Sequence, residues 1–279
     1  MYEHVSAHHR IQVTDNAAWR TLVFERNRQS SMALDDPFES DLEYVDYFHL
    51  TMAVKPDSAR TLVIGLGGGS VVKRMWRDYA AMRIDAVEID AEVVDVAREL
   101  FALPVDDRIS VTVGDGRVFV QTSAQTYDIV IVDAFDDDCV PRHLTTEEFM
   151  REVRDRLAPD GVVVYNFIGS LLGERSKSFR SLYRTASNVW RRLWVFPVGY
   201  GDNPTGAGHN LILLATDVQM TDEELLDRIA SRVDGLVSVR AFARFGEDLY
   251  RGAIRRGDVP LILDEPSAKK AARGKARRR

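Results

Sequence analysis

Acidic residues end or follow successive apolar stretches of this chain, and a glycine-rich loop comes before them. The loop Gly65–Ser70 (GLGGGS) follows the apolar stretch Thr61–Ile64. Glu88 ends the next apolar stretch, and Asp115 and Asp133 follow the two after it. Glycine lets a loop backbone approach a ligand closely, and a carboxylate after the second strand can accept the hydroxyls of a ribose. This order of residues predicts a nucleoside pocket that also contains acids able to take part in chemistry.

The nucleoside that fits this order best is of the S-adenosylmethionine type, and NAD fits less well. The loop matches the dinucleotide pattern G-x-G-x-x-G only in its first half, through Gly65 and Gly67, after which Gly68 follows. Asp115, next to Gly116, is placed to bind an adenine amino group after a third strand. Two simpler explanations stay open, because tight strand-to-helix turns use glycine anyway and Asp-Gly pairs also form turns.

An acidic segment, Asp133–Asp138, follows the fourth apolar stretch and holds four carboxylates in six residues. Carboxylates this close repel one another unless a cation lies among them. A polyamine or a metal ion would supply that cation, and the segment lacks the ligand spacing of a calcium loop. We therefore expect a cationic substrate and no metal, with a solvated acidic loop as the alternative.

The charge of the chain is unevenly distributed. The 279 residues carry a formal net charge of −6, but Ser267–Arg279 contains seven Lys or Arg and no acid. The other 30 basic residues face 43 Asp and Glu, so the body is acidic and suits a small cationic substrate better than a nucleic acid. The tail has no apolar residue larger than alanine, so we expect it to be disordered and solvated, with nucleic-acid contact as the less favoured alternative.

Three features of the sequence bear on the location of the protein. No apolar run approaches the ~18 residues of a membrane span. The N-terminal residues MYEHVSAHHR lack the apolar core of an export signal. The single cysteine, Cys139, cannot form a disulfide within the chain. Together they predict a cytoplasmic protein without membrane contact.

Strand-like and helix-like segments alternate from Thr61 onward, which predicts an α/β fold with a doubly wound, mostly parallel sheet. The expected strands are Thr61–Ile64, Arg83–Glu88, Ile109–Val113, Tyr127–Val132, Gly161–Asn166, Trp194–Val198 and Leu211–Ala215. The expected helices are Ser70–Tyr79, Ala91–Phe101, Arg117–Thr122, Thr146–Leu157, Ser176–Trp190 and Thr221–Val233. Ligands of such sheets bind outside the carboxyl ends of the strands, which is where the loop and the acids lie.

The first 56 residues follow a different pattern. Short alternating runs in residues 10–34 predict a small antiparallel β unit, and Leu42–Val54 has the spacing of a helix. We therefore divide the chain into an N-terminal β unit with a linking helix (1–56), a catalytic domain (57–266) and a basic tail (267–279).

Five segments carry a resemblance to a known family. They are, in chain order, VIGLGGGS, VEIDAEVVDVA, DDRISVTVGDGRVFV, YDIVIVDAFDDD and LTTEEFMREVRDRLAPDGVVV. Their order and spacing resemble the spermidine synthase (polyamine aminopropyltransferase) family over about Thr61–Asn166, and more loosely over the N-terminal unit. The resemblance implies a Rossmann-like methyltransferase fold and a homodimer or homotetramer. It also implies transfer of an aminopropyl group from decarboxylated S-adenosylmethionine to a diamine or polyamine, with release of 5′-methylthioadenosine.

The same resemblance implies roles for individual residues. Glu88 would bind the ribose of the donor, Asp115 its adenine, and Asp133 would accept the proton of the attacking amine. The other substrate-facing positions that it implies are Asp136, Gln29 and Tyr44.

One departure from the family concerns the donor. The family has an Asp that holds the aminopropyl ammonium where this chain has Gly68. Without that Asp the loop tolerates the carboxylate of S-adenosylmethionine, and its exposed amides can hydrogen-bond it. Two alternatives therefore stay open: an S-adenosylmethionine-dependent methyltransferase on the same scaffold, and a non-catalytic nucleoside- or polyamine-binding protein.

Overall fold

A seven-stranded sheet forms the centre of the molecule, a computed structural model that describes residues 2–136, 139–199, 209–234, 236, 239 and 245–265. The strand order is β10-β11-β9-β8-β5-β6-β7, and only β11 is reversed: it pairs antiparallel with both of its neighbours, β10 and β9, while the other pairs are parallel. The strands are β5 (Arg60–Ile64), β6 (Arg83–Glu88), β7 (Ile109–Val113), β8 (Tyr127–Val132), β9 (Leu157–Gly169), β10 (Arg192–Pro197) and β11 (His209–Thr216). The predicted α/β fold with a mostly parallel sheet is confirmed.

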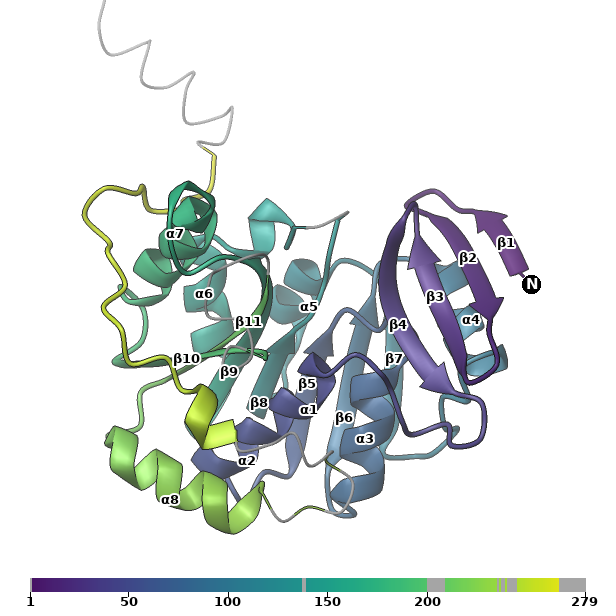
Figure 1. Cartoon of the computed structure of the whole chain (residues 1–279), viewed down its shortest axis with the longest axis horizontal. Helices are drawn as coiled ribbons and strands as arrows, with labels where there is room; N and C mark the ends of the chain where they lie inside the picture. The colour runs from purple at the N-terminus through teal and green to yellow at the C-terminus, as the bar shows by residue number, and fades with distance from the viewer. Residues whose placement is uncertain are drawn as a thin grey trace, which may run out of the picture.

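Helices cover both faces of this sheet (Figure 1). In β8, Ile129 and Ile131 join the core on one face while Val130 and Val132 join the core on the other, and all four are fully buried. A strand that is buried on both faces reads as a continuous apolar run, which is why these stretches are visible in the sequence. Helices α3 (Ser70–Asp78) and α8 (Asp222–Arg232) pack on the first face. Helices α5 (Gly116–Thr122), α6 (Glu147–Arg154) and α7 (Lys177–Ala186) pack on the second.

A separate four-stranded antiparallel sheet lies at one side of the molecule (Figure 1). It consists of β1 (Tyr2–Val5), β2 (Arg10–Asp15), β3 (Trp19–Phe24) and β4 (Asn27–Ala33). Its apolar face packs on helix α4 (Ala91–Glu99), where Leu22 and Phe24 share a core cluster with Val93 and Val96. The small N-terminal β unit expected for residues 10–34 is confirmed, and β1 is an addition that we did not predict.

The helix expected over residues 42–54 is a run of three short pieces. These are α1 (Tyr44–Tyr47), the 3₁₀ turn η1 (Phe48–Leu50) and α2 (Thr51–Val54). A buried ion pair joins this run to α3, since Arg74 lies 2.6 Å from the Asp46 carboxylate. Because Asp46 follows Tyr44 by two residues, the pair also fixes the start of the run relative to the helix that follows the glycine loop.

Strand β9 begins earlier than the sequence suggests. Residues 158–161 (APDG) were expected to separate a helix from a strand beginning at Gly161, but β9 already includes Leu157. Leu157 pairs with Tyr127, and the register with β8 then shifts before Val162 pairs with Ile129. The turn-forming residues therefore make an irregularity within the strand, with Asp160 at a φ of 62°, instead of ending the element.

The last described residues, 251–265, run along α6 and α7 and end beside the carboxyl ends of the parallel strands. The Glu147 amide donates to the Ile262 carbonyl (2.8 Å), and the Asp264 amide donates to Glu148 (2.9 Å). Arg117 of α5 pairs with Asp264 at 2.7 Å.

Further short 3₁₀ turns are η2 (Arg142–Leu144), η3 (Glu174–Ser176) and η4 (Phe245–Asp248). The predicted basic tail and the Asp137–Asp138 pair lie outside the described residues.

We find no helix that could cross a bilayer within the part of the chain that the structure describes.

Candidate functional site

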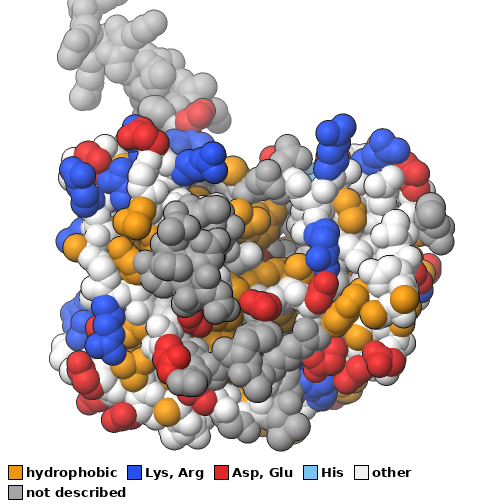
Figure 2. Space-filling view, viewed as in Figure 1, with side chains coloured by type: hydrophobic (Ala, Val, Ile, Leu, Met, Phe, Trp, Pro, Cys, Tyr) orange, Lys and Arg blue, Asp and Glu red, His pale blue; other side chains and the backbone are white. Residues whose placement is uncertain are grey.

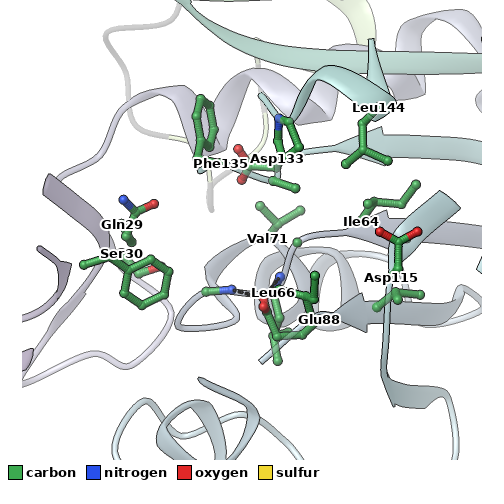
Figure 3. Close-up of a pocket in the computed structure, with 18 of the residues that line it drawn as sticks. Gln29, Ser30, Ile64, Leu66, Val71, Glu88, Asp115, Asp133, Phe135 and Leu144 are labelled. Carbon is green, nitrogen blue, oxygen red and sulfur yellow. Dashed lines mark hydrogen bonds between the residues drawn. The ribbon is translucent and has the colours of Figure 1, made fainter. Parts of the chain in front are cut away.

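A pocket opens at the carboxyl ends of β5, β6 and β8, where the small sheet meets the large one. The pocket is partly open to solvent, and Figure 2 shows the hollow with hydrophobic side chains in its wall. Eight of the ten predicted site residues line it: Gln29, Tyr44, Gly65, Gly67, Glu88, Asp115, Gly116 and Asp133. Figure 3 shows Glu88 and Asp133 on opposite sides, with Gln29 and Asp115 toward the two ends. Gly68 and Asp136 are not among its lining residues.

The glycine loop is pressed against the segment that leaves β8. Gly65 has a φ of 95°, and a Cβ atom there would lie 2.2 Å from the Asp133 carbonyl oxygen. No side chain fits at this distance from a backbone atom. Glycine at this position therefore lets the floor of the pocket approach the acidic segment.

Gly68 faces protein packing instead of the pocket. Its amide donates to the Ser30 hydroxyl at 2.8 Å. A Cβ atom there would lie 2.8 Å from the Phe101 ring and 2.9 Å from the Ser30 Cβ atom. The small sheet thus closes over the loop at this point, and an acid at position 68 would need both neighbours to move.

Glu88 holds the loop as well as facing the pocket. One carboxylate oxygen accepts from the Leu66 amide (2.9 Å) and the Gly67 amide (3.4 Å), and the other accepts from the Asp90 amide (3.2 Å). Burial raises the pKa of Glu88 above its ordinary value, and these backbone hydrogen bonds oppose the shift. A carboxylate offers about four acceptor positions, so roughly one remains for a ligand hydroxyl.

Asp115 has both carboxylate oxygens engaged. One oxygen accepts from the Val118 amide at 2.9 Å and caps the start of α5. The other lies 2.8 Å from the Nε2 atom of His143, which comes from η2. Asp115 therefore caps a helix and also lines the pocket, so its structural role does not exclude contact with a ligand.

Asp133 directly follows β8, and it lines the pocket together with Tyr44, the first residue of α1. Asn166 of β9 donates to its carboxylate at 2.9 Å, and Asn210 of β11 donates to Asn166 at 2.9 Å. Burial raises the pKa of Asp133 to about 6, although hydrogen bonds from Asn166 and Tyr44 lower it in part. The pKa of Tyr44 lies well above its ordinary value because of burial and of the Asp133 charge. The site therefore has a carboxylate of raised basicity, held in a fixed orientation.

Asp136 is placed apart from Asp133. It is exposed and forms a two-residue bridge with Cys139, through hydrogen bonds of 2.8 and 3.1 Å between their backbones. It lines a neighbouring outer cavity together with His8, Arg142 and Glu265. The acidic segment thus turns outward after Asp133.

Four residues of the site were missed by the sequence analysis: Ser30, His143, Asn166 and Asn210. The sequence could have indicated Asn166, because it ends the expected strand Gly161–Asn166, and the expected strand before it is followed by Asp133. The other three reach the site through antiparallel pairing or through loops, and no short sequence pattern marks them. Among the described residues we find no group of three or more His, Cys, Asp or Glu side chains placed to hold a metal ion.

Replacing a glycine beside the pocket with alanine tests how closely the surrounding residues pack. A Cβ atom at Gly116 would lie 2.3 Å from the Cγ2 atom of buried Ile64, whereas one at Gly114 meets nothing within 4 Å. We expect Gly116→Ala to lower the melting temperature by roughly 3–9 °C, because overpacking costs about 1–3 kcal/mol. Gly114→Ala is the matched control and should stay within about 2 °C of the parent in differential scanning calorimetry. Equal melting temperatures for the two variants would contradict this packing.

The structure resembles solved spermidine synthases. A probable spermidine synthase from Corynebacterium glutamicum superposes with a TM-score of 0.76 at 19% identity, covering 96% of this chain and 97% of that one. The spermidine synthase from Thermotoga maritima gives 0.71 at 19% identity, covering 90% and 84%. Human methyltransferase-like protein 13 gives 0.54 at 22% identity, covering 82% and 96%. At these identities the likeness supports the methyltransferase-like fold.

Sequence relatives carry the comparison further. A polyamine aminopropyltransferase from Chromobacterium violaceum is 30% identical over 252 residues, which are 88% of this chain and 90% of that protein. The corresponding protein of Vibrio vulnificus is 31% identical over 194 residues, 66% of this chain and 64% of that protein. A probable polyamine aminopropyl transferase of Bifidobacterium longum is 36% identical over 123 residues, 44% of this chain and 27% of that protein. The chain thus spans less than two thirds of the length of the last two relatives.

The model of the spermine/spermidine synthase domain matches residues 44–190, more than half of the chain. This match takes in Tyr44, the glycine loop, all three pocket acids and Asn166. The chain belongs to the spermine/spermidine synthase family.

Proposed function

We propose that the protein transfers an aminopropyl group from decarboxylated S-adenosylmethionine to the primary amine of a diamine or polyamine. The observation that carries the proposal is Asp133, a carboxylate with a pKa of about 6 that lines the same pocket as Glu88 and Asp115 and is held by Asn166. The names of the relatives and the family match support the same reaction. A solved spermidine synthase in complex with the transition-state analogue AdoDATO has the same fold, with a TM-score of 0.70 at 18% identity.

We place the donor along the length of the pocket. We assign the adenine to the end at Asp115 and Gly116, and the ribose to the remaining acceptor position of Glu88. The sulfonium then lies near Gly65 and Asp133. Three carboxylates in the lining complement a donor that carries a sulfonium and an ammonium.

The reaction is a direct displacement. The neutral amine of the acceptor attacks the aminopropyl carbon next to sulfur, the N–C bond forms and the C–S bond breaks. The bond pair stays on sulfur, so 5′-methylthioadenosine leaves as a neutral thioether. The new secondary ammonium gives its proton to Asp133, which also stabilises the positive charge as it develops on nitrogen. Asn166 and Asn210 orient the carboxylate, and Gln29 and Tyr44 face the chain of the donor or acceptor.

A second candidate is methyl transfer from S-adenosylmethionine on the same scaffold. The sequence leaves it open because no acid stands at position 68, but that position faces Ser30 and Phe101 and lies outside the pocket lining, so the missing acid does not choose between the two donors. In either case we expect a cytoplasmic homodimer or homotetramer, which light scattering of the purified protein would measure.

The test is product analysis with both donors. With decarboxylated donor and 1,4-diaminobutane or spermidine, we expect release of 5′-methylthioadenosine at the rate at which aminopropylated amine forms. S-adenosylhomocysteine released from S-adenosylmethionine would establish the methyltransferase instead. Binding of 5′-methylthioadenosine without any product would establish the non-catalytic alternative.

The dependence of the rate on pH tests the role of Asp133. The carboxylate is a base only above its pKa of about 6, and the acceptor amine is a nucleophile only above its own pKa, about 10 for an alkylamine. A plot of log kcat/KM against pH should therefore rise with a slope of two below about pH 6 and a slope of one from there to about pH 10. A single slope of one across the whole range would remove Asp133 from the mechanism.

A further inference from the structure

Asp115 and His143 form a hydrogen-bonded pair at the end of the pocket to which we assign the adenine. The Nε2 atom of His143 lies 2.8 Å from the Oδ2 atom of Asp115, and both residues line the pocket. A carboxylate only accepts hydrogen bonds, so the Nε2 atom carries the hydrogen and His143 is the donor. The contact joins two segments that lie 28 residues apart in the chain, and the aminopropyl transfer proposed above makes no use of it.

This pair fixes the plane of the Asp115 carboxylate. The Oδ1 atom accepts from the Val118 amide at 2.9 Å, but this contact alone lets the second oxygen turn, because the last side-chain torsion of Asp is broad. The hydrogen bond from His143 holds the second oxygen as well. About two of the four acceptor positions of the carboxylate then remain, and they can only accept. A base that binds there must therefore present a donor.

The backbone that carries His143 is held without the help of the imidazole ring. Leu144, the next residue of η2, is buried, and Figure 3 shows it in the wall of the pocket. The side chain of Arg142 donates to the Leu263 carbonyl at 2.8 Å. The side chain of Arg117 donates to the His143 carbonyl at 3.4 Å. Removing the imidazole should therefore leave η2 in place.

We propose that His143 is a positioning residue that makes the pocket selective for adenine over 6-oxopurines, and that it acts through Asp115. Adenine has an amino group at C6, whose N–H donates to one of the remaining acceptor positions of the carboxylate. Hypoxanthine has a carbonyl oxygen there, so two acceptors face each other and neither is paired. This role rests on the adenine placement of the proposed function, to which it adds the residue that orients the carboxylate.

The test compares binding of 5′-methylthioadenosine and 5′-methylthioinosine, which differ only in the base. By calorimetry the parent should bind the adenine nucleoside about 30-fold more tightly, as expected for one hydrogen bond to a charged group. His143→Ala should weaken binding of 5′-methylthioadenosine by about 5- to 10-fold and change binding of 5′-methylthioinosine by less than about twofold. His143→Gln, whose amide N–H can replace the Nε2 donor, should restore most of the preference.

Two further variants separate positioning from other roles. In Asp115→Ser the hydroxyl still caps α5 but the second oxygen is gone, so adding His143→Ala should change binding of 5′-methylthioadenosine by less than about twofold. His4→Ala is the matched control and should keep the selectivity of the parent. The His4 ring also faces an acid, Glu92 at 3.8 Å, its side chain is 48% exposed against 44% for His143, and it does not line the pocket.

Three results would overturn the inference. An equal loss of affinity for both nucleosides in His143→Ala would show that the ring only supports the wall of the pocket. A full effect of His143→Ala in the Asp115→Ser variant would show that the ring contacts the base itself. Unchanged binding of 5′-methylthioadenosine in His143→Ala would exclude any role in binding.

A failure of the proposed function gives a different result. The titrations need no acceptor and no turnover, so a protein that releases no product with any amine can still show a selectivity that depends on His143. If aminopropyl transfer occurs, KM for the donor should rise in His143→Ala together with the dissociation constant of 5′-methylthioadenosine, while kcat stays within about twofold of the parent. A parent that binds neither nucleoside would refute both the adenine placement and the role of His143.

Discussion

Replacing Asp133 with Asn is expected to lower the rate of aminopropyl transfer by a factor of about 10² to 10⁴ and to make the folded protein more stable. The rate falls because the amide cannot take the proton or balance the charge that develops on the amine. Binding of 5′-methylthioadenosine should change by less than about threefold, since the nucleoside contacts assigned to Glu88 and Asp115 are untouched. Initial rates and calorimetric titration of 5′-methylthioadenosine measure the two effects.

The gain in stability follows from the raised pKa. The folded protein holds Asp133 with a pKa of about 6 against an ordinary value of 3.8, so between these values the folded state binds more protons than the unfolded state. The contribution of Asp133 to the stability of the parent therefore falls as the pH rises from about 4 to about 6, and the full cost of its buried charge is present above pH 6. Asn carries no such charge and can still accept from Asn166.

We therefore expect Asp133→Asn to melt about 2–4 °C above the parent at pH 7.5, which corresponds to about 1 kcal/mol in a protein of this size. The difference should shrink below pH 6 and vanish near pH 4. Asp136→Asn, which changes an exposed acid of the same segment, is the control and should melt with the parent at every pH. A variant of Asp133 that is less stable at pH 7.5, or that keeps more than a tenth of the activity, would contradict the role given to this carboxylate.

The carboxyl-end acids could be predicted from the sequence because parallel strands fix where their ends lie. Glu88 ends β6, and Asp133 follows β8 directly. Both strands are neighbours of β5, so their ends and the glycine loop meet without any knowledge of side-chain packing. The apolar runs that reveal these strands are apolar because both faces of the sheet are covered.

What the sequence did not show depends on contacts between distant segments. The link from Asn210 through Asn166 to Asp133 requires β11 to lie antiparallel to β9, and nothing near residue 210 signals that pairing. Gly68 was predicted to face the cofactor, and it lies in the turn between β5 and α3 but outside the pocket lining. The direction of that position, toward Ser30 and Phe101, is set by the small sheet closing over it. For the same reason, the position of Asp136 could not be inferred from its closeness to Asp133 in the chain.

Replacing Glu88 with Gln should weaken binding of 5′-methylthioadenosine by about 10- to 100-fold. The carboxylate accepts three backbone hydrogen bonds, two from the glycine loop and one from Asp90, and a glutamine can accept on one side only. Its amide N–H groups would then face backbone N–H groups on the other side, so one buried donor loses its partner. The ribose hydroxyl also loses a charged acceptor, and each such loss is worth about 1.5–3 kcal/mol.

The expected signature of Glu88→Gln separates a binding residue from a residue that only supports the loop. If Glu88 contacts the nucleoside, KM for the donor rises together with the dissociation constant of 5′-methylthioadenosine, while the dependence of kcat on pH keeps the parent profile set by Asp133. If it only supports the loop, the melting temperature falls but the donor still saturates near its parent concentration. Calorimetry of 5′-methylthioadenosine alongside thermal unfolding measures both, with Asp136→Asn again as the control because its carboxylate lies outside the donor pocket. If the variant is folded and less stable but its dissociation constant for 5′-methylthioadenosine is unchanged, the ribose does not contact Glu88. The donor would then bind elsewhere along the pocket.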